Sequence, residues 1–440
     1  MAAQHPATGP GAGPGPAPPP QRGRLEAPVR PSQRILTVDI LRGFAILGIL
    51  LVNMALFNQS VLNMAVNLNP PAAALDQIAG GLIKFFAEGK FYSIFSFLFG
   101  LGMALQFARA EERNARFGPF WIRRMLVLLG FGLIHAYLFW PGDILILYSV
   151  MGIALLLWRK ARPRTLLICV VVFLLLPLLI NAALWGLTEL ARMSVGKAEM
   201  ARLVDEQIGA YRALASQADR IYATGSFLEV TAQRARDMAF MFSVWPFTAV
   251  NVLAIMLTGL YAGKRRIFAQ SRAVGGADIP GNLPFIRKVW LWGLIIGLIG
   301  NGIYVYFGQQ ANRAMPSLVN LISLFGQTFG APALALFYMA TLALLAERPV
   351  WRGRLAPLAN VGRMALTNYL LQSLIGTTLF YGYGFRLYGR IGIAGGIVLT
   401  VAIFLVQVAL STWWLGRFRF GPMEWLWRTL TYGKRQPMRG

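Results

Sequence analysis

Two ionisable side chains able to carry out acid–base chemistry together stand eight residues apart in an otherwise apolar stretch. His135 is one of two histidines, and the other, His5, lies in a leader rich in proline and glycine. Asp143 follows a turn predicted at Pro141-Gly142, so its carboxylate can fold back onto the imidazole. A carboxylate that holds one imidazole nitrogen makes the other a better base. We therefore predict a catalytic pair, and the alternative is a structural histidine bonded to a neighbouring helix.

The elements that must position this pair are membrane helices. Of the 440 residues, 56% are hydrophobic and 13% are charged. Apolar runs of about 20 residues, long enough to cross a bilayer as a helix, recur along the chain. Ten spans are predicted, at residues 38–57, 84–108, 121–140, 143–158, 165–190, 242–262, 287–307, 317–345, 361–381 and 391–415. The expected fold is an all-α, polytopic membrane bundle of about ten transmembrane helices, in which an ionisable side chain is costly and by default functional.

The positions of the basic residues predict how the bundle is oriented. The net charge is +25, and the short loops on one side carry 19 Lys and Arg residues against 3 on the other. Under the positive-inside rule, this places the N terminus and the C terminus in the cytoplasm. The positive charge is thereby explained by membrane topology, and no nucleic-acid partner is predicted; the expected partner is the lipid bilayer.

The segments outside the spans differ in composition. Residues 1–33 lack apolar periodicity and are predicted to be a disordered Pro/Gly-rich leader. Residues 191–241 carry mixed charge and are long enough to form extracytoplasmic helices of their own. The membrane domain is expected over 34–432, followed by a basic tail at 433–440. The single cysteine, Cys169, lies in an apolar run, and no metal site is predicted.

The first span carries a polar stripe. Asp39 and Arg42 are three residues apart and can pair, and Asn53 lies within about 60° of them on a helical wheel. The pair alone is interpreted as a structural salt bridge. With Asn53 included, the stripe is interpreted as the lining of a cavity.

Two further spans contribute candidates for a cavity or an acceptor-binding site. Glu88, near the start of the second span, could lie at the depth of His135, or it could be an interfacial residue that reaches water. Asn368 and Gln372 share a face of the ninth span, with Tyr369 beside them. They could line a polar cavity or form hydrogen bonds between helices.

Several stretches of this sequence together resemble the YeiB-like family of bacterial multi-span membrane proteins, a domain of unknown function. They are Arg34–Ile49, Gly89–Gly100, His135 with Gly142–Leu145, Gly362–Tyr369 and Phe420–Arg428. The similarity runs from about Arg34 to about Tyr432. This resemblance implies a bacterial cytoplasmic (inner) membrane protein.

YeiB-like proteins are in turn similar to membrane acyltransferases of the heparan-glucosaminide acetyltransferase type. Those enzymes move an acyl group from acyl-CoA on the cytoplasmic side to an acceptor, such as a sugar, at the other face, and a helix-borne histidine is the expected base. The resemblance assigns that role to His135. It implies acyl-CoA as co-substrate, no tightly bound cofactor, and a small hydroxyl or amine acceptor.

Residue chemistry allows specific roles in such a reaction. Asp143 would orient His135, and Asn368, Gln372 or Tyr369 could donate to the oxyanion. Arg42, Arg123 and Arg124 at the inner surface suit the phosphates of CoA. Arg124 precedes His135 by eleven residues, which is about three turns and ~16 Å along one helix face.

The segment Phe420–Arg428 is predicted to fold onto the cytoplasmic face as an amphipathic helix, with Glu424 pairing with an arginine. The alternative function is a small-solute transporter or channel, in which the same stripes line a path and the His135–Asp143 pair relays protons. Transporters often contain a pair of spans broken by Gly or Pro in corresponding halves. The sequence shows no such pair, which counts against this alternative.

Overall fold

The structure is a computed structural model that describes residues 35–66, 73–267, 270–272, 278–280, 282–311 and 315–439. The predicted leader at 1–33 lies outside the described residues. The described part is helical apart from its turns and two short strands, β1 (Gln270–Arg272) and β2 (Asp278–Pro280), which pair antiparallel.

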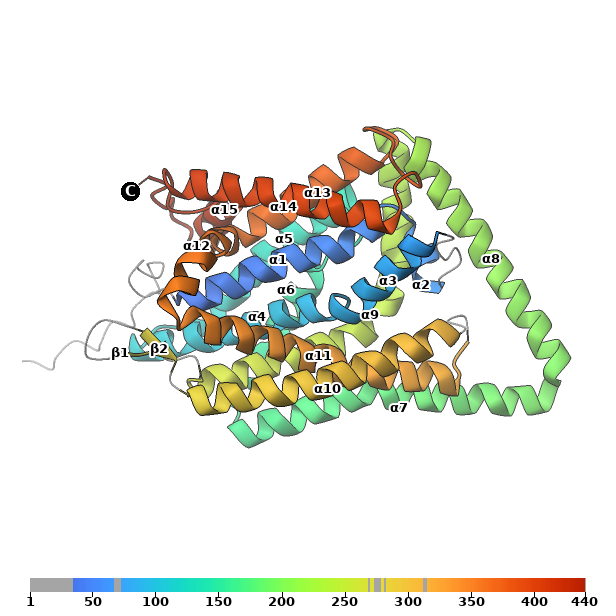
Figure 1. Cartoon of the computed structure of the whole chain (residues 1–440), viewed down its shortest axis with the longest axis horizontal. Helices are drawn as coiled ribbons and strands as arrows, with labels where there is room; N and C mark the ends of the chain where they lie inside the picture. Colours follow the sequence, from blue (N-terminus) through green and yellow to red (C-terminus); the bar gives the residue numbers. More distant parts are fainter. Residues whose placement is uncertain are drawn as a thin grey trace, which may run out of the picture.

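Long apolar helices form the body of the molecule (Figure 1). They are α1 (Leu36–Leu56), α4 (Lys90–Glu112), α5 (Phe117–Ile134), α7 (Pro163–Val195), α9 (Phe227–Lys264), α10 (Leu283–Gln310), α11 (Leu318–Ala346) and α14 (Ile393–Leu415). Eight helical segments of the described chain are long and apolar enough to cross a membrane. Two shorter helices, α6 (Leu145–Ala154) with its 3-10 extension (Leu155–Trp158) and α13 (Ala365–Phe380), correspond to the remaining two predicted spans. The all-α polytopic bundle is thus confirmed.

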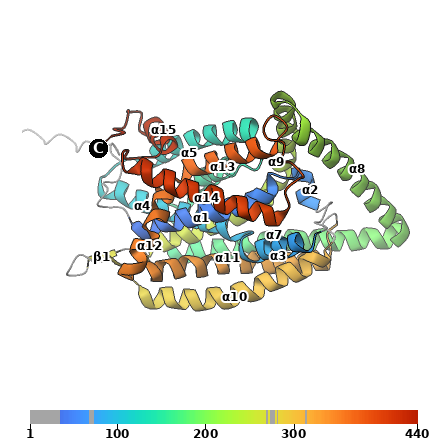
Figure 2. The same ribbon diagram turned by 45° about the horizontal axis from the view of Figure 1, so that its top comes forward.

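The other helices lie at the two ends of the bundle (Figures 1 and 2). One end carries α2 (Val61–Val66), α3 (Ala74–Phe86) and α8 (Lys197–Thr224). The opposite end, called the basic end here because the Lys- and Arg-rich loops gather there, carries α12 (Pro349–Arg363), α15 (Pro422–Tyr432) and the two strands. Helix α1 begins and α15 ends at the basic end, so both ends of the described chain lie on one side. The predicted amphipathic helix after the last span is therefore present, as α15, packed against α5 and α13.

Helix α1 lies at the centre and contacts α4, α11, α12, α13 and α14. Its inward residues Ile40, Leu41 and Leu50 are completely buried. Elsewhere, helices α10 and α11 approach so closely that a Cβ on Gly330 would lie 2.6 Å from the Gly300 carbonyl carbon. Small residues at such contacts allow membrane helices to pack by close van der Waals contact.

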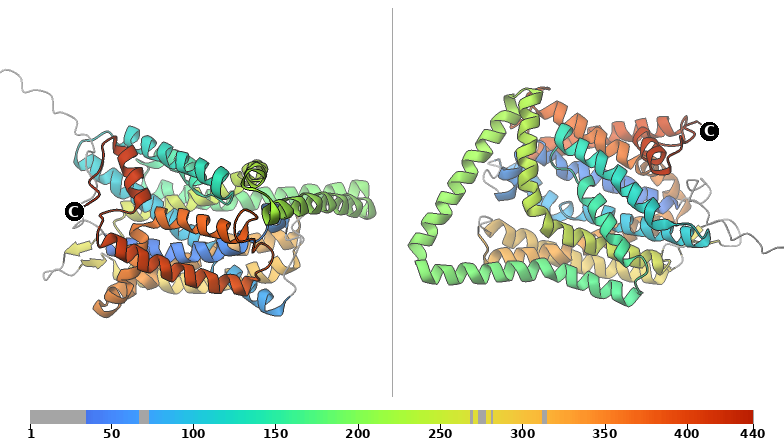
Figure 3. Two further views of the ribbon diagram at one scale, coloured as in Figure 1. Left: turned by 90° about the horizontal axis from the view of Figure 1, so that it is seen from above. Right: turned by 180° about the vertical axis from the view of Figure 1, so that it is seen from behind.

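The segment predicted at 191–241 is helical, as expected from its length. Helix α7 has 33 residues, or about 50 Å, which exceeds a bilayer core. Helix α8 then returns at an angle, and Figure 3 shows α7, α8 and α9 framing one end of the molecule. Helix α9 begins at Phe227, well before the predicted span at 242, because a capping box between Ser226 and Glu229 starts it early.

Candidate active site and the cavity below it

His135 lies where helix α5 widens into a short π-helix, His135–Phe139. The backbone amide of Trp140 closes this wide turn on the His135 carbonyl at 2.8 Å. Trp140 itself is extended, because the residue before a proline is disfavoured in the α region. Pro141 therefore ends the helix one turn after His135. Single π turns within membrane helices occur frequently at functional sites.

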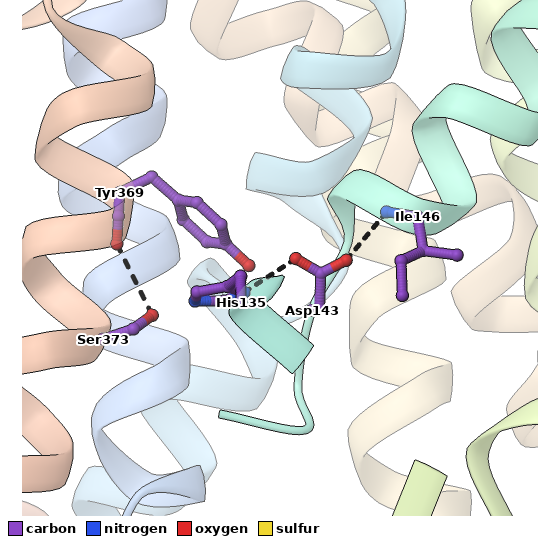
Figure 4. A network of polar contacts seen from close by, with 5 residues as sticks. All are labelled: His135, Asp143, Ile146, Tyr369 and Ser373. Atoms are coloured by element: carbon purple, nitrogen blue, oxygen red, sulfur yellow. Dashed lines mark hydrogen bonds and ion pairs between the residues drawn. The ribbon is translucent and has the colours of Figure 1, made fainter. Parts of the chain in front are cut away.

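The structure brings His135 and Asp143 together (Figure 4). The imidazole Nδ1 lies 2.7 Å from Asp143 Oδ2, while Asp143 Oδ1 accepts the backbone N–H of Ile146 at 2.7 Å. Both side chains are buried, at 1% and 0% exposure. Gly132 permits this approach, because a Cβ there would lie 2.7 Å from the Ile146 nitrogen. The turn between α5 and α6 thus holds the carboxylate on the ring.

The second ring nitrogen is unused. A carboxylate only accepts, so Nδ1 carries the hydrogen and Nε2 is the acceptor in the neutral ring. His135 Nε2 is buried and has no hydrogen-bond partner among the described residues. The Tyr369 ring lies 5.1 Å from the imidazole, and its hydroxyl points toward the His135–Asp143 pair (Figure 4). Asp143 therefore holds the imidazole in place, and Nε2 is left able to accept a proton.

A cavity of about 330 Å³ leads from the basic end toward this pair. It reaches inward as far as Ile49, Ile144 and Tyr369. Its walls between are mainly apolar, and they include Ile46, Phe95, Leu98, Phe99 and Leu128. His135 does not line the cavity itself. Tyr369, which does line it, has its ring 5.1 Å from the imidazole.

The mouth of the cavity is strongly basic. Five arginines line it: Arg42, Arg109, Arg124, Arg363 and Arg428. The carboxylates among the described lining residues are Asp39 and Glu424. Such an excess of guanidinium groups suits an anionic ligand, particularly one with phosphates.

Both carboxylates already have partners. Asp39 Oδ1 accepts from Arg42 at 3.1 Å, as the sequence predicts. Glu424 accepts from the backbone N–H groups of Leu366 and Thr367 at 2.7 and 3.0 Å, and from the Thr367 hydroxyl at 2.6 Å. Glu424 thus caps the N terminus of α13. The sequence predicts that Glu424 pairs with an arginine, and it does not predict this cap. Burial raises the pKa of the Glu424 carboxyl.

Two of the three arginines predicted to bind phosphate line the cavity. Arg124 stacks on Trp427 of α15, with its guanidinium carbon 3.7 Å from the ring centroid, and no described carboxylate pairs with Arg124 or with Arg109. Arg123 is exposed and lies against Gly433 instead. Adjacent helical residues point about 100° apart, so Arg123 does not line the cavity that Arg124 lines.

Other predicted cavity residues lie elsewhere. Asn53 is half-buried on α1, beyond Ile49 and outside the cavity. Glu88 lies in the turn before α4 and accepts the Tyr304 hydroxyl at 2.8 Å, so it faces α10 and not His135. The turn exists because Gly89 has a φ of +87°, which delays the start of α4 to Lys90.

Asn368 and Gln372 also face away from the cavity. Asn368 Nδ2 donates to Ser411 Oγ at 3.0 Å, and Gln372 Nε2 donates to Gln407 Oε1 at 2.8 Å, both on α14. They form hydrogen bonds between helices, which was the predicted alternative to lining a polar cavity. Of the three predicted oxyanion donors, only Tyr369, one residue further round α13 from Asn368, faces His135.

Sequence reasoning missed part of the cavity mouth. Arg109 and Arg363 count among the basic loop residues that predict the topology, and Arg428 ends the segment predicted to be an amphipathic helix. Their clustering on three separate helices, α4, α12 and α15, becomes visible only in the fold. The signal available in the sequence was their position within one turn of predicted helix ends on the same side.

Comparison with known proteins gives one consistent result. Residues 277–434 match a family described as "Protein of unknown function (DUF418)". The chain is 35% identical over 426 residues to the uncharacterized protein YxaH of Bacillus subtilis, covering 93% of this chain and 97% of that protein. It is 30% identical over 424 residues to the uncharacterized protein YeiB of Escherichia coli, covering 91% and 96%. A further relative, an uncharacterized 39.9 kDa protein of Bacillus acidopullulyticus, is 31% identical over 421 residues.

Proposed function

The chain belongs to the DUF418 family of YeiB-like membrane proteins, and we propose that it transfers an acyl group from acyl-CoA to a hydroxyl or amine acceptor. One observation carries the proposal. A cavity with an arginine-lined mouth and apolar walls includes Tyr369 in its lining, beside a buried His135–Asp143 pair whose Nε2 has no hydrogen-bond partner among the described residues.

The two parts of the cavity match the two parts of acyl-CoA. The phosphates of the nucleotide would bind the arginines at the mouth, where guanidinium groups can donate two hydrogen bonds to one phosphate. The narrow pantetheine arm would follow the apolar walls inward. Arg124 and His135 are separated by eleven residues of helix, a rise of about 16 Å, so a donor anchored at the mouth would carry its thioester toward Tyr369.

The chemistry follows from the hydrogen bonds. Nε2 of His135 takes the proton of the acceptor as its oxygen or nitrogen attacks the thioester carbonyl carbon. The carbon–sulfur bond then breaks, and the imidazolium returns the proton to the departing thiolate, which leaves as CoA. Asp143 stabilises the imidazolium between these steps. The Tyr369 hydroxyl donates to the oxyanion that forms on the carbonyl oxygen.

The orientation of the bundle fits this direction of transfer. The positive-inside rule assigns the basic end to the cytoplasmic side of a bacterial inner membrane, and acyl-CoA is found in the cytoplasm. The acceptor would approach from the other face. Transport of a solute would instead need a polar path past His135, but there the Phe57 and Trp140 rings pack 4.6 Å apart. The same packing lies on the route of the acceptor and must open for either function, so the preference for acyl transfer rests on the arginine-lined cavity and the His135–Asp143 pair.

Binding of the donor is the first test. Thermal unfolding of the detergent-purified protein would be measured with CoA, acetyl-CoA and octanoyl-CoA, because a ligand of the native state stabilises it by about 2.7 kcal/mol at a hundredfold excess over its Kd. We expect the midpoint to rise, with the rise lost in Arg124→Ala and kept in Arg123→Ala. These neighbours have the same charge, but only Arg124 lines the cavity. No rise with any CoA compound, or an equal rise in both variants, would contradict the donor site.

A further inference from the structure

A fully buried arginine lies on the opposite side of the His135 turn from the cavity. Arg234, on helix α9, is 0% exposed. No carboxylate in the described part of the chain forms an ion pair with it. Burying a guanidinium without a counter-charge is costly, and a membrane protein that keeps one there usually uses it.

The partners of Arg234 are the elements that carry the catalytic side chains. Its Nη1 donates to the backbone carbonyl of Leu138 at 2.8 Å, inside the π-helix that begins at His135. Its Nη2 donates to the hydroxyl of Tyr383 at 2.7 Å, in the loop that follows α13, the helix of Tyr369. One planar group therefore joins the supports of both residues.

The Leu138 carbonyl needs such a donor. The last carbonyls of a helix have no partner within the helix, and a cation there also complements the helix dipole. Because Pro141 stops the helix, no further turn can supply these hydrogen bonds. Arg234 satisfies one of them and is held in turn by the aromatic rings of Phe227, Tyr381 and Tyr383, each about 5.5 Å away. These rings leave the guanidinium little freedom to move.

We propose that Arg234 is a positioning residue, which fixes the His135 π turn against the end of α13 so that the imidazole keeps its place beside Tyr369. The inference rests on the proposed acyl transfer for its catalytic meaning. It predicts that loss of Arg234 lowers turnover by about a hundredfold, the effect of a small misplacement of a reacting group. Donor binding should not change, because the arginine-lined mouth is at the other end of the bundle.

The two histidines of the chain allow a direct test. In a His5→Ala background, protein labelled with nitrogen-15 at histidine contains a single imidazole, that of His135. Its two nitrogen resonances report the hydrogen bond at Nδ1 without any acyl-transfer assay. We expect Arg234→Gln to shift them and Arg236→Gln to leave them in place, because Arg236 is exposed two residues along the same helix.

Kinetics would complete the test. We expect Arg234→Gln to lower kcat while the KM for acyl-CoA stays unchanged, with part of the kcat restored in Arg234→Lys. If Arg234→Gln does not fold, the resonances and kcat would be measured on Tyr383→Phe, which removes one acceptor of the guanidinium. Resonances and kcat identical to the parent in these variants would overturn the inference. If the parent shows no acyl transfer, the proposed function fails, while the resonances still decide whether Arg234 positions His135.

Discussion

Replacing Asp143 with asparagine tests the His135–Asp143 pair with the least change in shape. Asparagine can keep one oxygen on the backbone N–H of Ile146, now bonded at 2.7 Å. The other oxygen, 2.7 Å from His135 Nδ1, would become an amide NH₂ group. Two donors cannot face each other, so Nδ1 would lose its hydrogen and become the acceptor. Nε2 would then carry the hydrogen and could no longer take a proton from the acceptor.

The magnitude follows from this change of tautomer. In serine proteases, the same replacement leaves the geometry intact and lowers kcat by about 10⁴-fold, which corresponds to about 5 kcal/mol in the activation free energy. The cost to folding should be smaller. A hydrogen bond to a charged group contributes about 1.5–3 kcal/mol, and only one of the two at Asp143 is altered. We therefore expect a folded protein that has lost nearly all turnover.

The assay is the release of free thiol from acetyl-CoA, with glucosamine as a probe acceptor because it offers both hydroxyl groups and an amine. Asp205→Asn serves as the control, since it removes the same charge from an exposed position on α8. The amount of folded protein would be taken from the thermal unfolding transition. Turnover per folded molecule in Asp143→Asn equal to the parent would refute the base assignment and leave the pair a structural one.

Three other substitutions test separate parts of the site. Tyr369→Phe removes one oxyanion donor and should lower kcat about 10²- to 10³-fold with an unchanged KM for acyl-CoA in the same thiol assay; an unaltered kcat would exclude the hydroxyl from the reaction. Gly132→Ala should destabilise the protein by about 1–3 kcal/mol, measured by chemical unfolding, because its Cβ would meet the Ile146 nitrogen; Gly130→Ala, with open space around it, is the control. Glu424 has a raised pKa in the folded state, so its contribution to stability is greatest below the unfolded carboxyl pKa of about 4.3 and is lost as the pH rises through the folded value. Glu424→Gln should remove that pH dependence from the thermal midpoint, and an unchanged slope would contradict it.

The positions of the membrane helices could be predicted because each helix corresponds to one continuous apolar run in the sequence. A run of apolar residues must satisfy its backbone within itself in lipid, so length and hydropathy suffice. The His135–Asp143 contact could also be predicted, since both residues flank one tight turn at Pro141-Gly142. The early start of α9 was missed because the charged residues in its first turns keep them out of an apolar run, although Ser226 and Glu229 form a capping box that the sequence shows.

The side that a polar residue faces was harder to predict. A helical wheel groups Asn368 with Gln372 correctly, but it does not say which neighbouring helix their face meets. That depends on how α13 packs against α14, which is a property of the whole bundle. The same limit applies to Arg123 and Arg124, where a rotation of one residue separates an exposed side chain from one that lines the cavity.

The place of α15 in the chain has a consequence for biosynthesis. A polypeptide is made from its N terminus, and its elements fold in that order. When α14 has entered the membrane, Trp427 is not yet available to stack on Arg124, and α13 still lacks its cap from Glu424. The nascent protein can thus be fully inserted while the wall that α15 gives to the cavity is missing. A chain that terminated before α15 would occupy the membrane with an incomplete cavity, so the cavity takes its final shape only once α15 has been made.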